Sequence, residues 1–340
     1  MRKIDTLKIE YLDVFNDDRF ESIESFLKNH FETSIFSLPR FLKSLLDTYS
    51  LKGYYLICSE GRILSGIASF YIKKNFFGKN SLTSVPAGFW AKDINSEKLL
   101  IEELKKIANK DNLKGPYFQD LPKKLNSLSN PKILYRAIVD LPEKKEDLLN
   151  LYSKNIRRDI QTAQKKGLKI VKDGEFKNFY KVWSWRIRDL GTPVIPFSFF
   201  KNMKEVFKDS MSLLFVKKEN RYVGGVLILK IDDFALNPYL ACLTKTLKYC
   251  PVPLLYHKML CWAVDNGCRY FDLGRSQFGS GNEKFKLRFG AKLKPLYSYS
   301  NEKIQNKGLG KKIAVFCWKW LPLSVANYFG PKVRRYIPFG

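Results

Sequence analysis

The sequence predicts an α/β (α+β) fold made by tandem duplication, with two mixed β-sheets that are each flanked by helices. Three observations carry this prediction: the size and apolar content of the chain, a repeated hairpin, and a repeated order of elements around that hairpin. The chain has 340 residues, of which 45% are hydrophobic and 15% are aromatic. This content gives each of two ordinary domains enough apolar side chains for a core of its own.

The repeated hairpin lies in residues 56–67 and 215–226, which both read as a strand, a Glu-x-Arg turn and a second strand. The residues that recur with unchanged spacing are Glu60, Arg62 and Gly66 in the first copy, and Glu219, Arg221 and Gly225 in the second. A match this short can arise by chance. The interpretation as a duplication therefore also depends on the elements around each hairpin.

Helical periodicity precedes each hairpin, and a further helix and a buried strand follow it. The predicted elements of the first half are helices 18–29, 39–49 and 96–109 and a strand at 117–118. Those of the second half are helices 147–166, 175–190, 197–208 and 252–266 and a strand at 270–271. This shared order predicts one domain over 1–145 and a second over 146–300, followed by a basic, aromatic tail over 301–340.

The charge of the chain predicts a polyanionic partner. Sixty Lys and Arg residues against 33 Asp and Glu residues give a net charge of +27. Such a field attracts nucleic acid, nucleotide-linked sugars, phospholipid headgroups or phosphorylated lipid carriers. A compositional bias toward Lys and Asn is the alternative explanation.

Histidine and cysteine usage narrows the chemistry. The chain has two histidines and six cysteines, and no CxxC pair. We therefore expect no histidine-dependent triad, no metal site and no permanently bound cofactor, and we interpret His257 as a packed residue on the apolar face of a helix. The N-terminus has no apolar signal segment, which favours a reduced, cytoplasmic protein.

Glycines and charges concentrate in residues 271–290, directly after the strand predicted at 268–271. Asp272, Arg275 and Ser276 are expected at the carboxyl end of that strand, where α/β sheets bind ligands. Farther along, a two-residue period places cations on one face and apolar residues on the other: Lys284, Lys286 and Arg288 alternate with Phe285, Leu287 and Phe289. The segment predicts an anion-binding turn, and an ordinary glycine-rich loop with solvated charges is the alternative.

Two other regions leave a structural and a functional interpretation open. Arg188-Asp189 ends a predicted helix just before the turn Gly191-Thr192-Pro193, and such a pair at a helix end can be purely structural.

Residues 313–329 are apolar and aromatic but too interrupted for a full membrane span. They favour either an interfacial helix with Trp318 and Trp320 at the headgroup level or a helix that caps the core.

Three segments then point to a family: 153–167 (SKNIRRDIQTAQKKG), 188–194 (RDLGTPV), and 271–276 with 285–290 (FDLGRS and FKLRFG). Together they resemble the FemAB-like proteins of exosortase and exopolysaccharide loci, within the BioF2-like, GNAT-related acyltransferase group. The resemblance covers residues 150–340, and over 1–145 it extends only to general architecture. The heptad 188–194 is its most specific part.

The resemblance implies two GNAT-like domains in tandem, with the main motifs in the second. It also implies transfer of an aminoacyl or acyl group onto an amine or hydroxyl of a cell-envelope or exopolysaccharide precursor. The donor is expected to be aminoacyl-tRNA or acyl-CoA, and the acceptor an anionic nucleotide- or lipid-linked glycan precursor. The usual acetyl-CoA signature of GNAT enzymes, a basic residue before a Gly-x-Gly/Ala turn, is not evident after either predicted central strand.

The Phe-Lys-x-x-Phe-Gly element of the family implies an active-site lysine, which here is Lys286. Lys286 and Arg275 are the expected cationic donors to an oxyanion, with contact to a phosphate as the alternative for Lys286. Asp272 is expected to accept a proton from the amine or to orient it, with pairing to Arg275 or capping of the turn as the alternative. The predicted substrate contacts are Asn155, Arg157, Arg188, Asp189, Thr192, Ser276 and Lys284.

Two other function classes stay open. One is an acyl-CoA-dependent N-acetyl- or acyltransferase of the GNAT superfamily. The other is a non-catalytic protein that binds polyanions or membranes and has a transferase fold, although no RNP1, KH or zinc-finger pattern is present. The expected location is the cytoplasm, with peripheral contact to the inner face of the membrane through 313–329.

Overall fold

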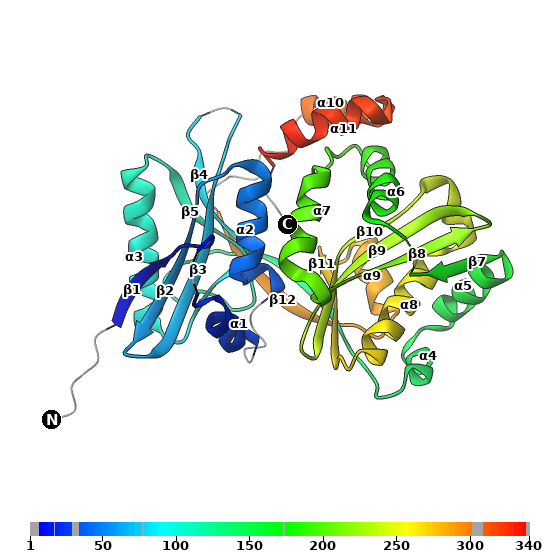
Figure 1. The fold of residues 1–340 in the computed structure, drawn as a ribbon, viewed down its shortest axis with the longest axis horizontal. Coiled ribbons are helices and arrows are strands. Elements are labelled where there is room, and N and C mark those ends of the chain that lie inside the picture. Colours follow the sequence, from blue (N-terminus) through cyan, green and yellow to red (C-terminus); the bar gives the residue numbers. More distant parts are fainter. Residues whose placement is uncertain are drawn as a thin grey trace. The chain divides into compact units, whose positions relative to one another are not determined.

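The structure is a computed structural model that describes residues 7–16, 18–28, 34–76, 78–172, 174–300 and 309–337 (Figure 1). The chain forms two compact units. Unit 1 consists of Met1–Leu134, Pro295–Gln305 and Arg335–Gly340, and unit 2 of Tyr135–Lys294 and Asn306–Arg334. Neither unit is a single continuous stretch of chain.

Unit 1 is built on a mixed sheet. Its strands are β1 (Leu7–Leu12), β2 (Gly53–Glu60), β3 (Ile63–Lys73), β4 (Ser81–Ala91), β5 (Lys114–Leu121) and β12 (Lys292–Tyr299), which lie in this order. Its helices are α1 (Phe20–Lys28), the short η1 (Ile35–Ser37), α2 (Pro39–Tyr49) and α3 (Ile94–Lys110). All neighbouring strands are antiparallel except β4 and β5, which α3 joins as a parallel pair.

Unit 2 contains a second mixed sheet, in the order β6, β11, β10, β9, β8, β7. These strands are β6 (Lys132–Asp140), β7 (Leu168–Val171), β8 (Met211–Lys218), β9 (Arg221–Ile231), β10 (Phe234–Cys242) and β11 (Tyr270–Ser276). The α-helices are α4 (Leu148–Leu151), α5 (Lys154–Lys165), α6 (Phe176–Asp189), α7 (Phe197–Phe207), α8 (Pro251–Asp265), α9 (Gly281–Leu287), α10 (Leu309–Trp320) and α11 (Leu323–Arg334). Short 3-10 helices are η2 (Lys145–Asp147), η3 (Lys208–Ser210) and η4 (Thr244–Tyr249).

The two sheets repeat one plan, which confirms the predicted fold class. In each unit four antiparallel strands precede a helix and one parallel strand: β1 to β4, α3 and β5 in unit 1, and β7 to β10, α8 and β11 in unit 2. The predicted hairpins are β2–β3 and β8–β9. In both units the strand beyond the parallel pair comes from elsewhere in the chain, because β6 pairs with β11 and β12 pairs with β5.

The sheet of unit 2 is covered on both faces. On β9, Val226 and Ile228 belong to the core that α5 and α8 share with the sheet. Their alternate neighbours Leu227 and Leu229 are also fully buried, on the opposite face, which follows from the two-residue period of a strand. Both faces of the sheet that contains β11 are therefore covered by other parts of unit 2.

The helix predicted over 147–166 is interrupted. Tyr152 is extended, and Ser153 caps a new helix, α5, because its hydroxyl accepts a hydrogen bond from the Ile156 N–H. The Ser153 N–H donates to the Arg288 carbonyl at 2.8 Å. This hydrogen bond links the start of α5 to the segment that carries the predicted active-site lysine.

Candidate functional site

The segment 271–290 is a strand, a turn and a helix, so the predicted turn is confined to a short stretch between β11 and α9, and the alternative, a glycine-rich loop, does not describe the segment. Strand β11 continues to Ser276, and α9 begins after Ser280, whose hydroxyl accepts a hydrogen bond from the Glu283 N–H at 3.2 Å. The Glu283 carboxylate in turn accepts a hydrogen bond from the Gly279 N–H. The two side chains thus satisfy backbone N–H groups on either side of the helix start.

The predicted alternation of exposed cations and buried apolar residues is also wrong. Within α9, Lys286 is 3% exposed, whereas Leu287 is 39% exposed. A helix places residues three and four apart on one face, so Phe285 and Phe289 both pack against Tyr256, with ring centroids 5.2 Å away. Lys286 points instead toward β11.

A β-bulge in β11 receives Lys286. Two residues, Leu273 and Gly274, stand opposite Ala137 of β6, because the register shifts between Asp272 and Arg275. Gly274 has a φ of +80°, a conformation that costs a residue with a side chain about 1–2 kcal/mol. The bulge turns two successive carbonyls toward α9, and bulges of this kind often lie next to active sites.

The Lys286 ammonium binds both carbonyls. Its Nζ donates to the Gly274 oxygen at 2.8 Å and to the Arg275 oxygen at 2.9 Å, so two of its three N–H donors are used. Burial lowers the pKa of Lys286 to about 8, and the neighbouring Asp272 opposes that shift. The group is therefore a buried cation that deprotonates within reach of physiological pH.

Asp272 is the anionic partner in this cluster. Its side chain is 9% exposed, and its Oδ1 accepts a hydrogen bond from the Gly274 N–H at 2.7 Å. Burial raises the pKa of Asp272, while the charges of Arg136 and Lys286 and the Gly274 hydrogen bond lower it. Asp272 thus both caps the bulge and balances two buried cations.

The sequence prediction missed three polar residues near this cluster. Arg136 of β6 is 8% exposed and lies opposite Arg275 in the register. Glu283 is 4% exposed, and Asn282 donates to the buried Ser276 hydroxyl at 3.1 Å. A single cation inside the apolar run Ile-Leu-Tyr-Arg-Ala-Ile-Val was the signal for Arg136.

The remaining predicted site residues divide into two groups. Arg275 and Lys284 have exposed side chains beside the cluster, and Asn155 and Arg157 are exposed on α5. Arg188 and Asp189 form an ion pair at 2.7 Å, the Thr244 hydroxyl donates to Asp189 at 2.6 Å, and Arg188 donates to the Leu321 carbonyl at 3.2 Å. The Thr192 N–H bonds to the Ile187 carbonyl. Arg188 of the heptad is thus hydrogen-bonded to the residue Leu321, which lies between α10 and α11.

A cysteine and a histidine also meet in unit 2. The Cys261 sulfur lies 3.7 Å from the His257 ring nitrogens, and His257 Nδ1 is 3.3 Å from the Tyr152 hydroxyl. Burial raises the pKa of the Cys261 thiol and lowers that of His257 to about 4. Both groups are thus held in their neutral forms, which is the reverse of an activated thiolate–imidazolium pair. This agrees with the interpretation of His257 as a packing residue.

Comparison with known proteins places this geometry in a fold class. Residues 152–287 match the family model described as an acetyltransferase (GNAT) domain. A search of curated proteins found no match. The β11 bulge, α9 and Lys286 lie within the matched GNAT segment.

Solved structures extend the similarity to both units. The crystal structure of FemX is 14% identical with a TM-score of 0.65, over 85% of this chain and 96% of that one. L-PGS from Bacillus licheniformis is 13% identical with a TM-score of 0.56, over 87% and 95%. A tandem GNAT protein from the clavulanic acid biosynthesis pathway is 9% identical with a TM-score of 0.54, over 86% and 97%. The chain has the tandem GNAT fold of FemAB-like proteins, as the resemblance predicted.

Proposed function

We propose that this protein is a FemAB-like transferase that moves an aminoacyl or acyl group onto an amine or hydroxyl of a cell-envelope or exopolysaccharide precursor. The observation that carries the proposal is the buried Lys286 ammonium, held at the bulge of β11 inside the GNAT segment. A buried lysine whose pKa is lowered to about 8 costs folding energy, which supports a role in chemistry.

The reaction joins the acceptor nitrogen or oxygen to the donor carbonyl carbon, and the bond from that carbon to the donor oxygen or sulfur breaks. Negative charge develops on the carbonyl oxygen in the transition state. In our proposal the charge of Lys286 stabilises that oxyanion, because a cation in a buried site acts through a low dielectric. Asp272, with its raised pKa, takes up the proton that the acceptor loses and passes it to the donor oxygen or sulfur, which departs with the bonding electrons.

Exposed cations around the cluster support an anionic acceptor. Arg275 and Lys284 flank the bulge, and Arg157 adds a third cation on the helix that the Ser153–Arg288 hydrogen bond ties to it. All three side chains are exposed, which is where cations of a protein contact phosphates. For the donor we propose aminoacyl-tRNA, with acyl-CoA as the second candidate.

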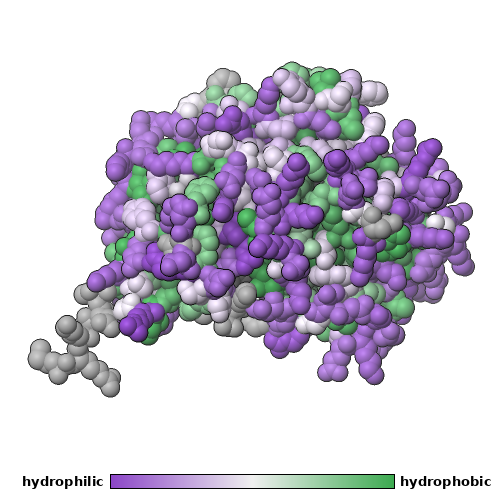
Figure 2. Space-filling view, viewed as in Figure 1, coloured by the Kyte–Doolittle hydropathy of each residue, from purple (hydrophilic) through white to green (hydrophobic). Residues whose placement is uncertain are grey.

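We also propose that α10 and α11 touch the membrane surface. No helix in the described ranges is long and apolar enough to cross a bilayer. The two helices nevertheless expose Phe316, Trp320 and Tyr328 by 63%, 76% and 62%. Figure 2 shows hydrophobic surface beside hydrophilic surface at these helices. Aromatic and basic side chains together suit an interfacial helix on anionic lipid.

The transfer reaction is tested directly. Purified protein is incubated with a labelled pool of aminoacyl-tRNA, or a pool of acyl-CoA, and a precursor extract from cells that make the protein. We expect label in a precursor with one donor pool, and transfer that is about 10²–10³ slower with the Lys286→Met variant. If neither pool supports transfer while both proteins bind polyanions equally, the chain is a binding protein and the proposal fails.

A further inference from the structure

The turn between β11 and α9, residues 277–280, exposes an aromatic ring beside the candidate site. The Phe278 side chain is 70% exposed, and Phe278 takes no part in the hydrophobic core that β11 shares with α5 and α8. Keeping an aromatic ring in water is unfavourable, because burial of apolar surface is what stabilises a fold. Exposed aromatic side chains on loops that a scaffold holds in place are typical of binding sites.

Hydrogen bonds on both sides of the ring hold this turn. The Ser280 N–H donates to the Gln277 carbonyl at 3.1 Å, and the Gly279 N–H donates to the Glu283 carboxylate. Gly279 has a φ of +74°, a conformation that favours glycine. The exposed ring of Phe278 is therefore presented by an ordered turn.

Tyr135 of β6 supplies a second ring. It lies opposite Ser276 in the register of β6 and β11, and its ring centroid is 5.5 Å from that of Phe278. The planes of these two rings, which we call the aromatic pair, are inclined by 49°. A flat base can stack on only one of two planes inclined in this way. The puckered ring of a pyranose has C–H groups that point in several directions and can contact both, so the aromatic pair suits a sugar better than a base.

Polar side chains accompany the aromatic pair in the same segment. Gln277 and Asn282 are exposed, and the Asn282 Nδ2 donates to the Ser276 hydroxyl at 3.1 Å, which fixes its amide beside the turn. A side-chain amide offers donors and an acceptor, so it can bind a hydroxyl group in either role. Apolar ring faces bordered by hydroxyl groups are the surface that a pyranose presents, and the segment matches both parts.

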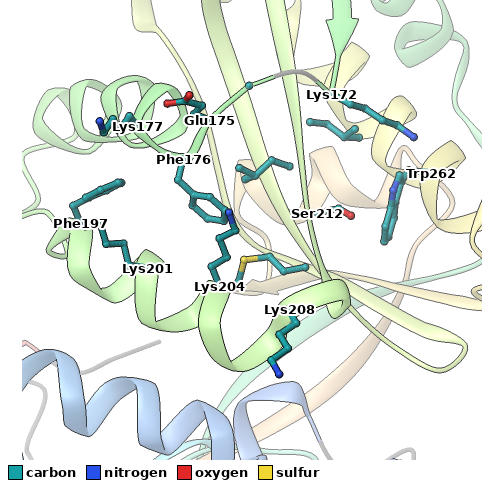
Figure 3. Close-up of a pocket in the computed structure, with 14 residues that line it drawn as sticks. Lys172, Glu175, Phe176, Lys177, Phe197, Lys201, Lys204, Lys208, Ser212 and Trp262 are labelled. Carbon is teal, nitrogen blue, oxygen red and sulfur yellow. The ribbon is translucent and has the colours of Figure 1, made fainter.

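The aromatic pair lies within reach of the proposed chemistry. Lys286 binds the carbonyls of Gly274 and Arg275, and Phe278 follows Gly274 by four residues, which span at most about 14 Å. A sugar on the aromatic pair can therefore place a hydroxyl, or an amine on a short arm, near the Lys286 ammonium. The lysine-lined cleft at the start of β8 is a different surface, since none of the residues that line it belongs to β6, β11, α9 or this turn (Figure 3).

We infer that the aromatic pair binds a pyranose ring of the acceptor and so determines which acceptors reach Lys286. The inference rests on the proposed transfer, because it names part of the substrate of that reaction. The sugar packs on Phe278 and Tyr135, and the group that attacks the donor carbonyl extends along β11 toward the bulge. Both residues determine specificity, and neither takes part in the chemical step.

Saturation-transfer NMR tests the sugar site without any reaction. The sugar probes are methyl β-D-glucoside and methyl β-D-N-acetylglucosaminide. Adenosine monophosphate is the base probe, because aminoacyl-tRNA and acyl-CoA both contain adenine. Phe278→Ala removes the exposed ring, and Phe278→Tyr keeps one. The matched control is Phe76→Ala in unit 1, because Phe76 is 62% exposed and also contacts a tyrosine ring, that of Tyr336, at a centroid distance of 4.1 Å.

We expect at least one methyl glycoside to bind, with an affinity that falls about fivefold or more in Phe278→Ala and less than about twofold in Phe278→Tyr and Phe76→Ala. In the transfer assay, Phe278→Ala should raise the acceptor concentration for the half-maximal rate by about the same factor and leave the maximal rate within about twofold. The affinity for adenosine monophosphate should be the same in all four proteins.

The absence of glycoside binding, equal weakening in Phe76→Ala, or weaker binding of adenosine monophosphate alone in Phe278→Ala would overturn the inference. Transfer by a Phe278→Ala protein with unchanged glycoside affinity would also overturn it and leave the proposed reaction intact. Glycoside binding that depends on Phe278, without transfer from either donor pool, would refute the proposed reaction and not the sugar site.

Discussion

Replacing Lys286 with methionine distinguishes the role of this side chain in catalysis from its role in the stability of the fold. Methionine keeps the length of the side chain and removes the ammonium group. The 3% exposed lysine makes two hydrogen bonds to backbone carbonyls of the β11 bulge, at 2.8 and 2.9 Å. The substitution therefore removes two contacts and one buried charge together.

The two effects on stability oppose each other. Hydrogen bonds to a charged group contribute about 1.5–3 kcal/mol each, so two contribute about 3–6 kcal/mol. The drop in the pKa of Lys286 from 10.5 to about 8 means that charging it in the fold costs about 3 kcal/mol, which methionine avoids. The net loss is about 0–3 kcal/mol, which is smaller than the stability of an ordinary domain.

The effect on catalysis has no such compensation. Losing a group that stabilises an oxyanion lowers the rate by about 10²–10³. We therefore expect Lys286→Met to stay folded, by circular dichroism and urea denaturation, and to lose transfer by that factor in a single-turnover assay. Transfer within threefold of the wild type would refute the electrostatic role. An unfolded variant would show instead that Lys286 is a structural support for the bulge.

Further predictions concern pH, backbone and membrane. The kcat/KM of transfer should fall as pH rises through about 8, because Lys286 loses its charge there. The residual activity of Lys286→Met should not show this fall. Between about pH 8 and 10.5, Lys286 binds fewer protons in the folded protein than in the unfolded chain. The contribution of Lys286 to the free energy of unfolding should therefore rise with pH in this range, as measured by urea denaturation. Gly274 and Gly167 both have a positive φ, so replacing either with Ala should lower the free energy of unfolding by about 1–2 kcal/mol. Only Gly274→Ala should also lower transfer tenfold or more. Trp320→Ser should weaken sedimentation with anionic vesicles about tenfold, whereas Ile63→Ser, also exposed, should not.

Most of the fold could be predicted because local patterns and the duplication agreed. Helix 39–49 has the predicted bounds, and the two hairpins lie at matching positions of the two sheets. The exchange of β6 and β12 could not be predicted, since each strand follows one sheet in the chain and pairs elsewhere. Partner choice of this kind depends on long-range pairing, which hydropathy along the chain does not record.

The residues of the candidate site could be named from the sequence, but the predicted geometry of residues 284–289 was wrong. A two-residue period over 284–289 was read as an extended segment, although Ser280 and Glu283 already had the spacing of a helix cap. That error placed Lys286 on an exposed face, whereas the structure buries it under the bulge at Gly274.

The mass of the envelope and polysaccharide precursors tests the central claim most directly. These precursors are extracted from cells that make the protein, from cells that lack it, and from the latter complemented with wild-type protein or with Lys286→Met. We predict one precursor that carries an added aminoacyl or acyl mass in the wild type and after wild-type complementation, and lacks it in the other two. Identical precursor masses in all four strains would contradict the assignment of a transferase.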